Sequence, residues 1–370
     1  MTVLFLRGLI FCVLVLSGVG CSRTTQVVLD PSAAGVGVIE HIFVATTRDV
    51  DQDGKIDSGR STAPRYYLYD ISVPPDRNEG EIKNPRGKPD PRTEFVATKA
   101  IAYRDGRQFE KAMSAKIGKL PASDKEAVIY VHGFNNTFSD GIVRLAQLSH
   151  DFQRKGVSVH YAWPSKGKAL GYEYDRDSVL FSRDGLQELI ESTKRAGAKH
   201  ITLVGHSMGS QLIMETLRQM EISRAGSVNS TIDALILISP DIDVNVFKSQ
   251  ANRISKLPEP FIIFVSQKDR ALGLSSLISG EKERVGNIQD ISELGDYDIA
   301  VVDVTEFSKG LGHNTVADTP ELIELFAQLE EFAGAFSTEG NGRVTRVDTV
   351  ALTVRSATKI VLTPVEAITE

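Results

Sequence analysis

Short apolar runs alternate with longer amphipathic segments along most of the chain. Most of the runs are apolar at every position, which is typical of parallel strands buried on both faces of a sheet. The segments between them repeat their apolar side chains every three or four residues, as amphipathic helices do. The predicted strands are 127–131, 157–163, 199–204, 232–238, 261–265 and 297–302, and the clearest helices are 138–155, 177–196 and 211–220. This order predicts an α/β fold in which helices cover both faces of a mostly parallel sheet.

The flanking segments have other patterns. Two more strands are predicted at 38–46 and 66–73, followed at 74–93 by a loop rich in proline, glycine and charge. A last helix is predicted to begin near Asp318-Thr319-Pro320, where an early proline follows a capping residue. We therefore expect amino-terminal strands at 38–126, a core at 127–336, together one domain at 38–336, and a tail at 337–370 that forms either a short hairpin or no fixed structure.

The first twenty residues have the pattern of a secretory signal. Arg7 precedes an apolar run from Leu9 to Leu16, and small residues lead to Cys21. This pattern resembles a bacterial lipoprotein signal, in which the cysteine is lipidated and becomes the mature N-terminus, and Ser22 then favours the outer membrane. We expect a signal peptide at 1–20, a lipid-anchored tether at 21–37 and a location in the bacterial cell envelope, facing the periplasm. A simple signal peptide and an uncleaved membrane anchor are the alternatives.

Composition narrows the functional classes. The 370 residues are 41% hydrophobic and 24% charged, and the net charge of −6 comes without basic blocks, which disfavours nucleic-acid binding. There are two cysteines, Cys12 and Cys21, and Cys12 lies inside the apolar signal. After removal of the signal no pair would remain for an internal disulfide, and no thiol would remain as a nucleophile.

The pentapeptide Gly205-His206-Ser207-Met208-Gly209 lies between the predicted strand 199–204 and the predicted helix 211–220. A G-x-S-x-G sequence in this context predicts a nucleophile elbow, a sharp turn that exposes the serine. The two glycines let strand and helix approach each other, and the helix N-terminus places positive potential near the serine. Ser207 is therefore the candidate nucleophile.

A serine hydroxyl needs an adjacent base, and the base needs an orienting acid. Among the seven histidines, His313 lies in a glycine-rich loop after the last predicted strand, at the edge where the serine is expected. The acid should lie between nucleophile and histidine in chain order. Asp269, directly after strand 261–265, is the preferred candidate, and Asp241, one strand earlier, is the main alternative.

Ester attack also requires N–H donors for the developing oxyanion. We expect the backbone N–H of Met208, which begins the nucleophile helix, and that of Phe134, which follows strand 127–131. Gly133 would allow the close approach of this loop. This chemistry requires no metal and no organic cofactor.

Several longer motifs carry a resemblance to known proteins. From Ala127 to about Phe336 the chain resembles the α/β-hydrolase superfamily. More narrowly it is similar to a bacterial α/β-hydrolase family of unassigned biological role. The shared segments are Phe43-Val-Ala-Thr-Thr-Arg48, Val131-His-Gly-Phe-Asn135 with Phe138, Trp163-Pro-Ser165 with Tyr174-Asp175, the elbow, and Asp269-Arg-Ala-Leu272. The resemblance implies the fold and a Ser-His-Asp hydrolase, and it implies no substrate.

The surroundings of the site are less specific. Phe138, Trp163 and Tyr172 are candidates for substrate contact, and each fits the core equally well. Arg48 would meet an acidic group of the substrate or, more in keeping with its position, pair with a carboxylate such as Asp175. Only a short segment, 239–260, follows the strand after the elbow, so we expect no large cap, an open site, and soluble or flexible esters as substrates.

One segment points to different chemistry. Asp49-Val-Asp51-Gln-Asp53-Gly54 has the spacing that begins a calcium loop. The twelfth position, which should be glutamate, is Arg60, and no helices are predicted on either side. A polar turn between strands is the favoured interpretation, a weak structural calcium site is the alternative, and no metal site is predicted.

The sequence as a whole predicts a serine hydrolase of the esterase or lipase-like kind. It would act on a small-molecule or lipid ester and be held to a membrane through its lipid anchor. Two alternatives stay open. One is a non-catalytic envelope lipoprotein that uses the hydrolase scaffold for binding, and the other is an acyltransferase with the same triad.

Overall fold

The computed structural model describes residues 27–83, 87–280, 283–308, 310, 312–327, 344–347, 350–354 and 359–364. The predicted signal peptide at 1–20 and the predicted lipidation site Cys21 lie outside these residues. Among the described helices, none is long and apolar enough to cross a membrane.

One twelve-stranded sheet organises the described part of the chain, in the order β10-β11-β12-β9-β8-β7-β6-β4-β5-β1-β2-β3. The run from β12 to β1 is parallel, and both ends of the sheet are antiparallel. The strands are β1 (Val38–Val50), β2 (Ile56–Val73), β3 (Val96–Tyr103), β4 (Glu126–Val131), β5 (Val157–Ala162), β6 (His200–His206), β7 (Ala234–Ile238), β8 (Phe261–Val265), β9 (Ala300–Asp303), β10 (Val344–Val347), β11 (Val350–Val354) and β12 (Lys359–Pro364).

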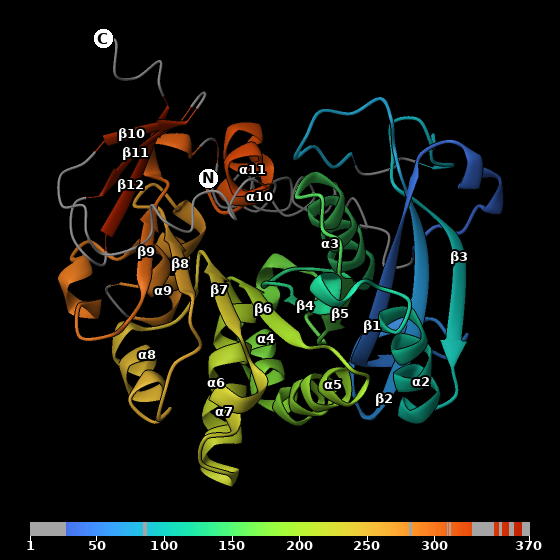
Figure 1. The fold of residues 1–370 in the computed structure, drawn as a ribbon, viewed down its shortest axis with the longest axis horizontal. Helices are drawn as coiled ribbons and strands as arrows, with labels where there is room; N and C mark the ends of the chain where they lie inside the picture. Colours follow the sequence, from blue (N-terminus) through green and yellow to red (C-terminus); the bar gives the residue numbers. More distant parts are fainter. Residues whose placement is uncertain are drawn as a thin grey trace, which may run out of the picture.

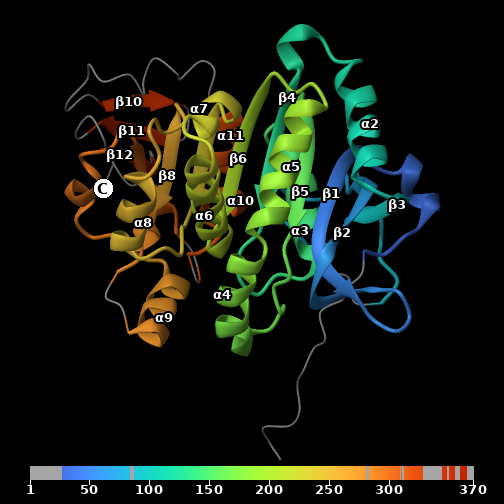
Figure 2. The same ribbon diagram turned by 90° about the horizontal axis from the view of Figure 1, so that it is seen from below.

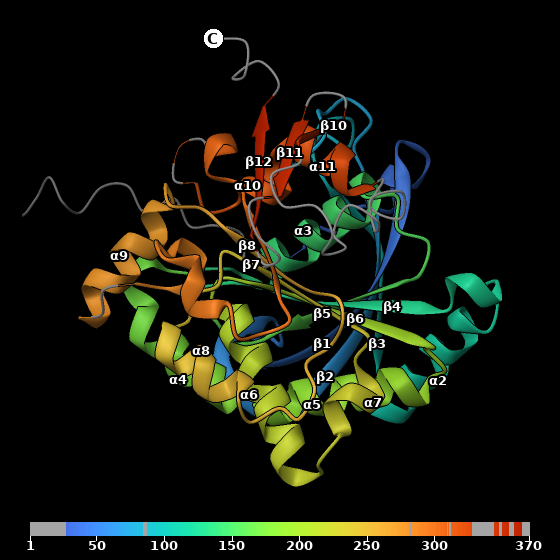
Figure 3. The same cartoon turned by 60° about the vertical axis from the view of Figure 1, so that its left-hand side comes forward.

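Helices cover both faces of this sheet (Figures 1 and 3). On one face lie α3 (Phe138–Asp151), α10 (Thr315–Asp318) and α11 (Pro320–Ala327), and on the other α2 (Gly106–Ile117), α5 (Arg183–Arg195), α6 (Met208–Ser223), α7 (Ser227–Thr231) and α8 (Val244–Ala251). The helices α4 (Tyr172–Phe181) and α9 (Arg270–Ser279) lie beyond the carboxyl ends of the strands (Figure 2). The predicted fold class, a mostly parallel sheet covered on both faces, is confirmed.

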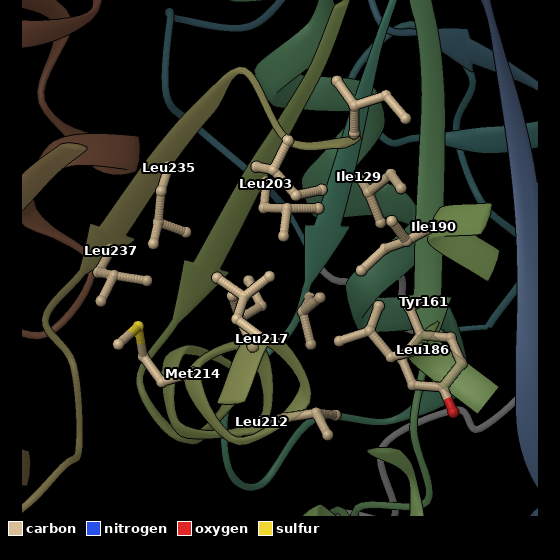
Figure 4. Close-up of a cluster of buried hydrophobic side chains, with 14 of the residues drawn as sticks. Ile129, Tyr161, Leu186, Ile190, Leu203, Leu212, Met214, Leu217, Leu235 and Leu237 are labelled. Atoms are coloured by element: carbon tan, nitrogen blue, oxygen red, sulfur yellow. The ribbon is translucent and has the colours of Figure 1, made fainter. Parts of the chain in front are cut away.

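The larger core lies between the sheet and α5 and α6. Figure 4 shows aliphatic side chains of β4, β6 and β7 facing those of the two helices. Burying each such side chain stabilises the fold by roughly 1.5–3 kcal/mol, which explains why these strands are apolar on this face. The residues concerned include Ile129, Leu203, Leu235 and Leu237 of the strands, and Leu186, Ile190, Leu212 and Leu217 of the helices, all buried.

Several predicted boundaries differ from the structure. The predicted helix 177–196 is two helices, α4 and α5, separated at Ser182. The strand predicted at 66–73 is the end of the longer β2, because β1 and β2 pair along most of their lengths. Between β7 and β8 the segment 239–260 carries the short helix α8, in keeping with the absence of a large cap.

Both predicted appendages are partly built into the domain. In the tether predicted at 21–37, the N–H of Ala97 donates to Val28 O (3.0 Å) and that of Asp30 to Ala97 O (2.8 Å), and the short helix η1 (Pro31–Gly35) follows. In the tail predicted at 337–370, β10 and β11 form the hairpin that was one of the alternatives, and β12 pairs with β9. The described parts of both segments therefore extend the sheet or pack on it, because their backbone groups complete exposed strand edges.

Candidate active site

Ser207 occupies the turn between β6 and α6 in a backbone conformation that is rare for a side-chain-bearing residue, with φ 52° and ψ −123°. Its N–H donates to Ile238 O (3.0 Å), which ties the turn to the neighbouring strand. A Cβ at Gly205 would lie 2.8 Å from Ser210 Cα, and one at Gly209 would collide with the carbonyl of Val131. Gly205 therefore lets β6 and α6 approach at this angle, and Gly209 lets the start of α6 lie against the end of β4.

Asp269 and His313 form a direct hydrogen bond, with 2.7 Å between Asp269 Oδ2 and His313 Nδ1. The Asp269 side chain is fully buried, and that of His313 is 18% exposed. The second carboxylate oxygen of Asp269 accepts from the N–H groups of Ala271 (3.0 Å) and Leu272 (3.1 Å) and so caps α9. The carboxylate is therefore fixed by the helix at the same time as it orients the imidazole.

The loop that carries His313 is attached to the neighbour of the serine. His206 Nε2 lies 3.0 Å from His313 O, and the two ring centroids are 4.7 Å apart. Burial lowers the pKa of His206 to about 3, so the ring is neutral at pH 7. Since a carbonyl only accepts, Nε2 carries the proton of this hydrogen bond. Among the described contacts no hydrogen bond joins Ser207 Oγ to His313, although the residue next to Ser207 holds the loop.

Asp241, the alternative acid, belongs to a separate buried cluster. Its oxygens accept from Tyr172 Oη (3.1 Å) and Ser275 Oγ (2.6 Å), and Arg284 Nε lies 3.3 Å away. Asp241 and Tyr172 were candidates from the sequence, whereas Ser275 and Arg284 were not singled out. Ser275 lies on α9, a helix that was not predicted, so no sequence signal indicated that Asp241 and Tyr172 meet in one cluster.

The loop after β4 lies against the elbow. A Cβ at Gly133 would stand 2.8 Å from Ser207 Cβ, so the glycine allows the contact that the sequence analysis expected. Asn136 Nδ2 donates to the carbonyls of Phe134 (2.9 Å) and Gly133 (3.3 Å) and braces the loop from within. Met208, the other expected donor, is fully buried at the first position of α6.

Arg48 does not face a substrate. It is 2% exposed, and its two terminal nitrogens donate to the carbonyls of Asn136 and Ser165, each at 2.9 Å. Burial lowers the pKa of Arg48 to about 10, and the negative charge of Asp175 opposes this shift more than any other. Arg48 therefore supports the loop after β4 and the loop after β5.

Two of the three residues predicted as substrate contacts, Trp163 and Phe138, take the alternative position in the core. Trp163 is fully buried, stacks on His132 with 4.9 Å between centroids, and donates from Nε1 to His132 O (2.6 Å). Phe138 is 2% exposed and packs on Tyr67 and Tyr69. Both belong to the core because their rings close the space between the loops and the sheet.

Tyr172, the third predicted contact, is nearer to the site. It is 7% exposed, and its ring meets the edge of Phe134 at 5.4 Å between centroids. Burial raises its pKa to about 12, so the hydroxyl stays protonated as a donor to Asp241. Tyr172 therefore stands behind the loop that carries Phe134.

The segment Asp49–Asp57 spans the turn between β1 and β2. Asp51 Oδ1 accepts from the N–H groups of Asp53 and Lys55, each at 2.9 Å, as in a polar hairpin turn. Within the residues that the structure describes, no three His, Cys, Asp or Glu side chains are grouped so that they could hold a metal ion.

A parallel sheet with a strained serine between β6 and α6 defines an α/β hydrolase. Residues 108–331 match the family described as an alpha/beta hydrolase of unknown function, DUF900, and the chain belongs to this family.

Individual relatives are distant. An uncharacterized protein from Nostoc sp. is 31% identical over 165 residues, which cover 32% of this chain and 43% of that protein. The chain thus matches less than half the length of this curated relative.

Three of the similar solved structures are hydrolases of low sequence identity to this chain. An esterase from Pyrococcus furiosus is 13% identical over 81% of this chain and 96% of its own, with a TM-score of 0.39. An esterase from Pyrobaculum calidifontis is 12% identical over 82% and 87%, with a TM-score of 0.39. A dienelactone hydrolase from Anabaena variabilis is 14% identical over 58% and 88%, with a TM-score of 0.37. At these scores the likenesses assign no substrate.

Proposed function

We propose that the protein is a serine hydrolase, carboxylesterase or lipase-like, that cleaves an ester through an acyl-enzyme. The observation that carries the proposal is the 2.7 Å hydrogen bond between Asp269 and His313, in a loop held by the neighbour of the strained Ser207. In this proposal Ser207 is the nucleophile, His313 the base and Asp269 the orienting acid.

Each group has one task in the reaction. Asp269 accepts a hydrogen bond from Nδ1–H of His313, which keeps the proton on Nδ1 and leaves Nε2 of the imidazole unprotonated and able to take the proton of Ser207 Oγ. The oxygen then bonds to the ester carbonyl carbon, and His313 returns the proton to the leaving alcohol. Water attacks the acyl-enzyme by the same route and releases the acid. The Oγ–imidazole hydrogen bond would form as substrate binds, since such bonds are often long in free enzymes.

The developing negative charge needs donors at the elbow. We assign this role to the N–H groups of Met208 and Phe134, because α6 begins at Met208 and the loop of Phe134 lies against Ser207 through Gly133. Losing one such donor costs an enzyme about 100- to 1000-fold in kcat.

A fluorophosphonate probe tests the nucleophile directly. We expect the wild type to be labelled and Ser207→Ala to stay unlabelled with an unchanged circular dichroism spectrum. Ser210→Ala is the matched control, since Ser210 is a buried serine on the first turn of the same helix, and it should label normally. A folded wild type that resists labelling would instead favour the non-catalytic binding protein.

Substrate scope needs its own assay. Hydrolysis of p-nitrophenyl esters of graded acyl length would rank the acyl pocket. Adding competing alcohols would separate a hydrolase from an acyltransferase, because a transferase would give new esters in place of the free acid.

We also propose that Cys21 is lipidated and anchors the protein in the cell envelope, at the outer membrane. The proposal rests on the apolar run and the small residues that precede Cys21. Metabolic labelling with a palmitate analogue tests it: label should enter the wild type and be absent from Cys21→Ser.

A further inference from the structure

The helix α9 is amphipathic, and the face that carries most of its large aliphatic side chains points to solvent. Its buried face carries Leu272, Ser275 and Ser276. Its solvent face carries three large aliphatic side chains, which are 57%, 78% and 52% exposed: Leu274, Leu277 and Ile278. A surface helix normally buries its apolar stripe, so this orientation has to be held by something other than apolar packing.

Polar contacts hold the helix in this orientation. Ser275 Oγ donates to Asp241 (2.6 Å) and lies 2.6 Å from Tyr172 Oη. Arg284, which pairs with Asp241, also donates to Ser279 Oγ. The buried carboxylate and guanidinium need these serine hydroxyls, since an unpaired buried polar group is costly. Turning the helix to hide its leucines would break this cluster, so the aliphatic side chains stay outside.

The exposed face lies beside the proposed active site. Asp269, which binds His313, is the N-cap of α9. The contact between Ser275 and Tyr172 ties α9 to the start of α4, and the fully exposed Leu170 precedes this helix by two residues. Figure 2 shows α9 and α4 beyond the carboxyl ends of the strands. We call Leu170, Leu274, Leu277 and Ile278 the α9 patch.

Basic side chains flank the α9 patch in a protein whose net charge is −6. Lys166 and Lys168 precede Leu170, and Arg270 begins α9; all three are exposed. None of these three forms an ion pair with a described residue, whereas Lys268 is paired with Glu306 (3.5 Å). Exposed aliphatic side chains with cations around them fit a lipid surface that carries anionic headgroups.

We propose that the α9 patch docks on a lipid bilayer with anionic headgroups and turns the active-site edge toward it. The docking proposal also has a consequence for the substrate, which rests on the proposed function: the ester would belong to a lipid or another amphiphile held in the membrane. This differs from the expectation of soluble esters, which rested on the missing cap alone. The docking itself requires no catalysis.

A fluorophore on the patch tests docking without reference to activity. The full chain with Cys12→Ala and Cys21→Ser would carry an environment-sensitive dye on Leu277→Cys. Adding phosphatidylcholine vesicles that contain phosphatidylglycerol should shift the emission to the blue, and vesicles of phosphatidylcholine alone should shift it less. The matched control is the dye on Ile222→Cys, which is 49% exposed at the far end of α6 and should not respond.

Two outcomes would overturn the docking proposal. The first is an unchanged emission of the dye at position 277 under conditions in which the protein sediments with the vesicles. The second is the same blue shift when the protein concentration is raised without lipid. That result would show that a second copy of the chain, and not a bilayer, covers the α9 patch. Lys168→Gln with Arg270→Gln should remove the preference for phosphatidylglycerol, and an unchanged preference would contradict the role of charge.

A second variant tests the link to substrate. Leu277→Ser with Ile278→Ser should lower hydrolysis of an ester packed in vesicles by about tenfold, because two apolar side chains no longer enter the lipid. Hydrolysis of a dissolved short-chain p-nitrophenyl ester should not change, and Ile222→Ser should affect neither. An equal loss on both substrates would contradict docking. Absence of activity in the wild type together with a responding dye would refute the hydrolase and leave the docking intact.

Discussion

Arg48 and Asp175 hold the same two loops through opposite backbone groups. Arg48 donates to one carbonyl of the loop 135–136 and one of the loop 165–166, each at 2.9 Å. Asp175 accepts from one N–H of each loop, at 3.3 Å and 2.6 Å. Burial raises the pKa of Asp175, as it lowers that of Arg48. Two buried charges therefore position the loop that follows Phe134.

Removing the cation should misplace this loop. Arg48→Met leaves two carbonyls and the Asp175 charge without their partner, so we expect a loss of stability of about 3–5 kcal/mol in urea unfolding. If the loop supplies an oxyanion donor, kcat should fall about 100-fold with a smaller change in KM, because a displacement of about 1 Å has this effect. Arg195→Met, a change at a half-exposed surface ion pair, is the control and should alter stability by about 1 kcal/mol at most. Normal kcat in a folded Arg48→Met would show that the loop does not take part in catalysis.

Asparagine substitutions should separate the two candidate acids. Asp269→Asn cannot hold the same tautomer of His313, and a comparable change in other triads lowers kcat about 10⁴-fold. Asp241→Asn should instead lower the stability, since it leaves Arg284 buried without its counter-charge. Steady-state kinetics with urea unfolding on both variants measures this. The assignment fails if Asp241→Asn alone abolishes turnover in a folded protein.

Acid should destabilise the fold through its buried histidines. Burial lowers the pKa of His160 and His206 to about 3 and that of His132 well below its ordinary value. In the unfolded chain these histidines titrate near pH 6.5. Below that pH the unfolded chain binds protons that the folded protein does not. Stability is therefore complete above about pH 6.5 and falls by about 1.4 kcal/mol per pH unit for each histidine as the pH decreases toward 3.

The variant His160→Gln tests whether the buried histidines cause this acid sensitivity. We expect the free energy of unfolding, measured in urea between about pH 7 and 5, to fall with decreasing pH about one third less steeply than in the wild type, because one of the three buried histidines is gone. His200→Gln is the control, since His200 is exposed on β6, and its slope should match the wild type. An identical slope in His160→Gln would assign the acid sensitivity to other groups.

Two glycine substitutions should change stability in opposite directions. Gly205→Ala places a Cβ 2.8 Å from the backbone of Ser210, so we expect overpacking of about 1–3 kcal/mol or more. Gly273→Ala meets nothing within 4 Å on the outer side of α9 and should stabilise the protein by roughly 0.5–1 kcal/mol, because it lowers the entropy of the unfolded chain. Thermal unfolding measures both. A neutral Gly205→Ala would mean that the elbow is not tightly packed.

Local patterns carried much of the fold prediction. Apolar runs marked the central strands because those strands are buried on both faces, and Gly205 of the elbow is dictated by contacts within one strand-turn-helix unit. The break at Ser182 was missed because the apolar spacing continues across it. The sequence left Trp163 open between core and pocket wall, because its position at the end of a strand is compatible with both, and the structure buries it.

The helix α9 shows the limit of this reasoning. Its serines face inward only because Asp241 and Arg284, from two other segments, stand behind them. Periodicity assigns the apolar side of a helix to the core and so predicts the opposite orientation. The sequence of α9 does not indicate that a buried ion pair from other segments lies against this helix.

The sequence by itself determined the α/β class and the serine at the elbow, since both depend on residues close together along the chain. It favoured Asp269 as the acid and kept Asp241 as the alternative, because strand order alone does not show which carboxylate meets the histidine. Only the tertiary structure placed Asp269 within 2.7 Å of His313, put Asp241 in a different cluster and turned Leu274 and Leu277 of α9 outward. These outcomes depend on which strand ends meet at one edge of the sheet and on which buried charges must be neutralised there. Both are set by segments that are far apart along the chain, so no local stretch of residues determines them.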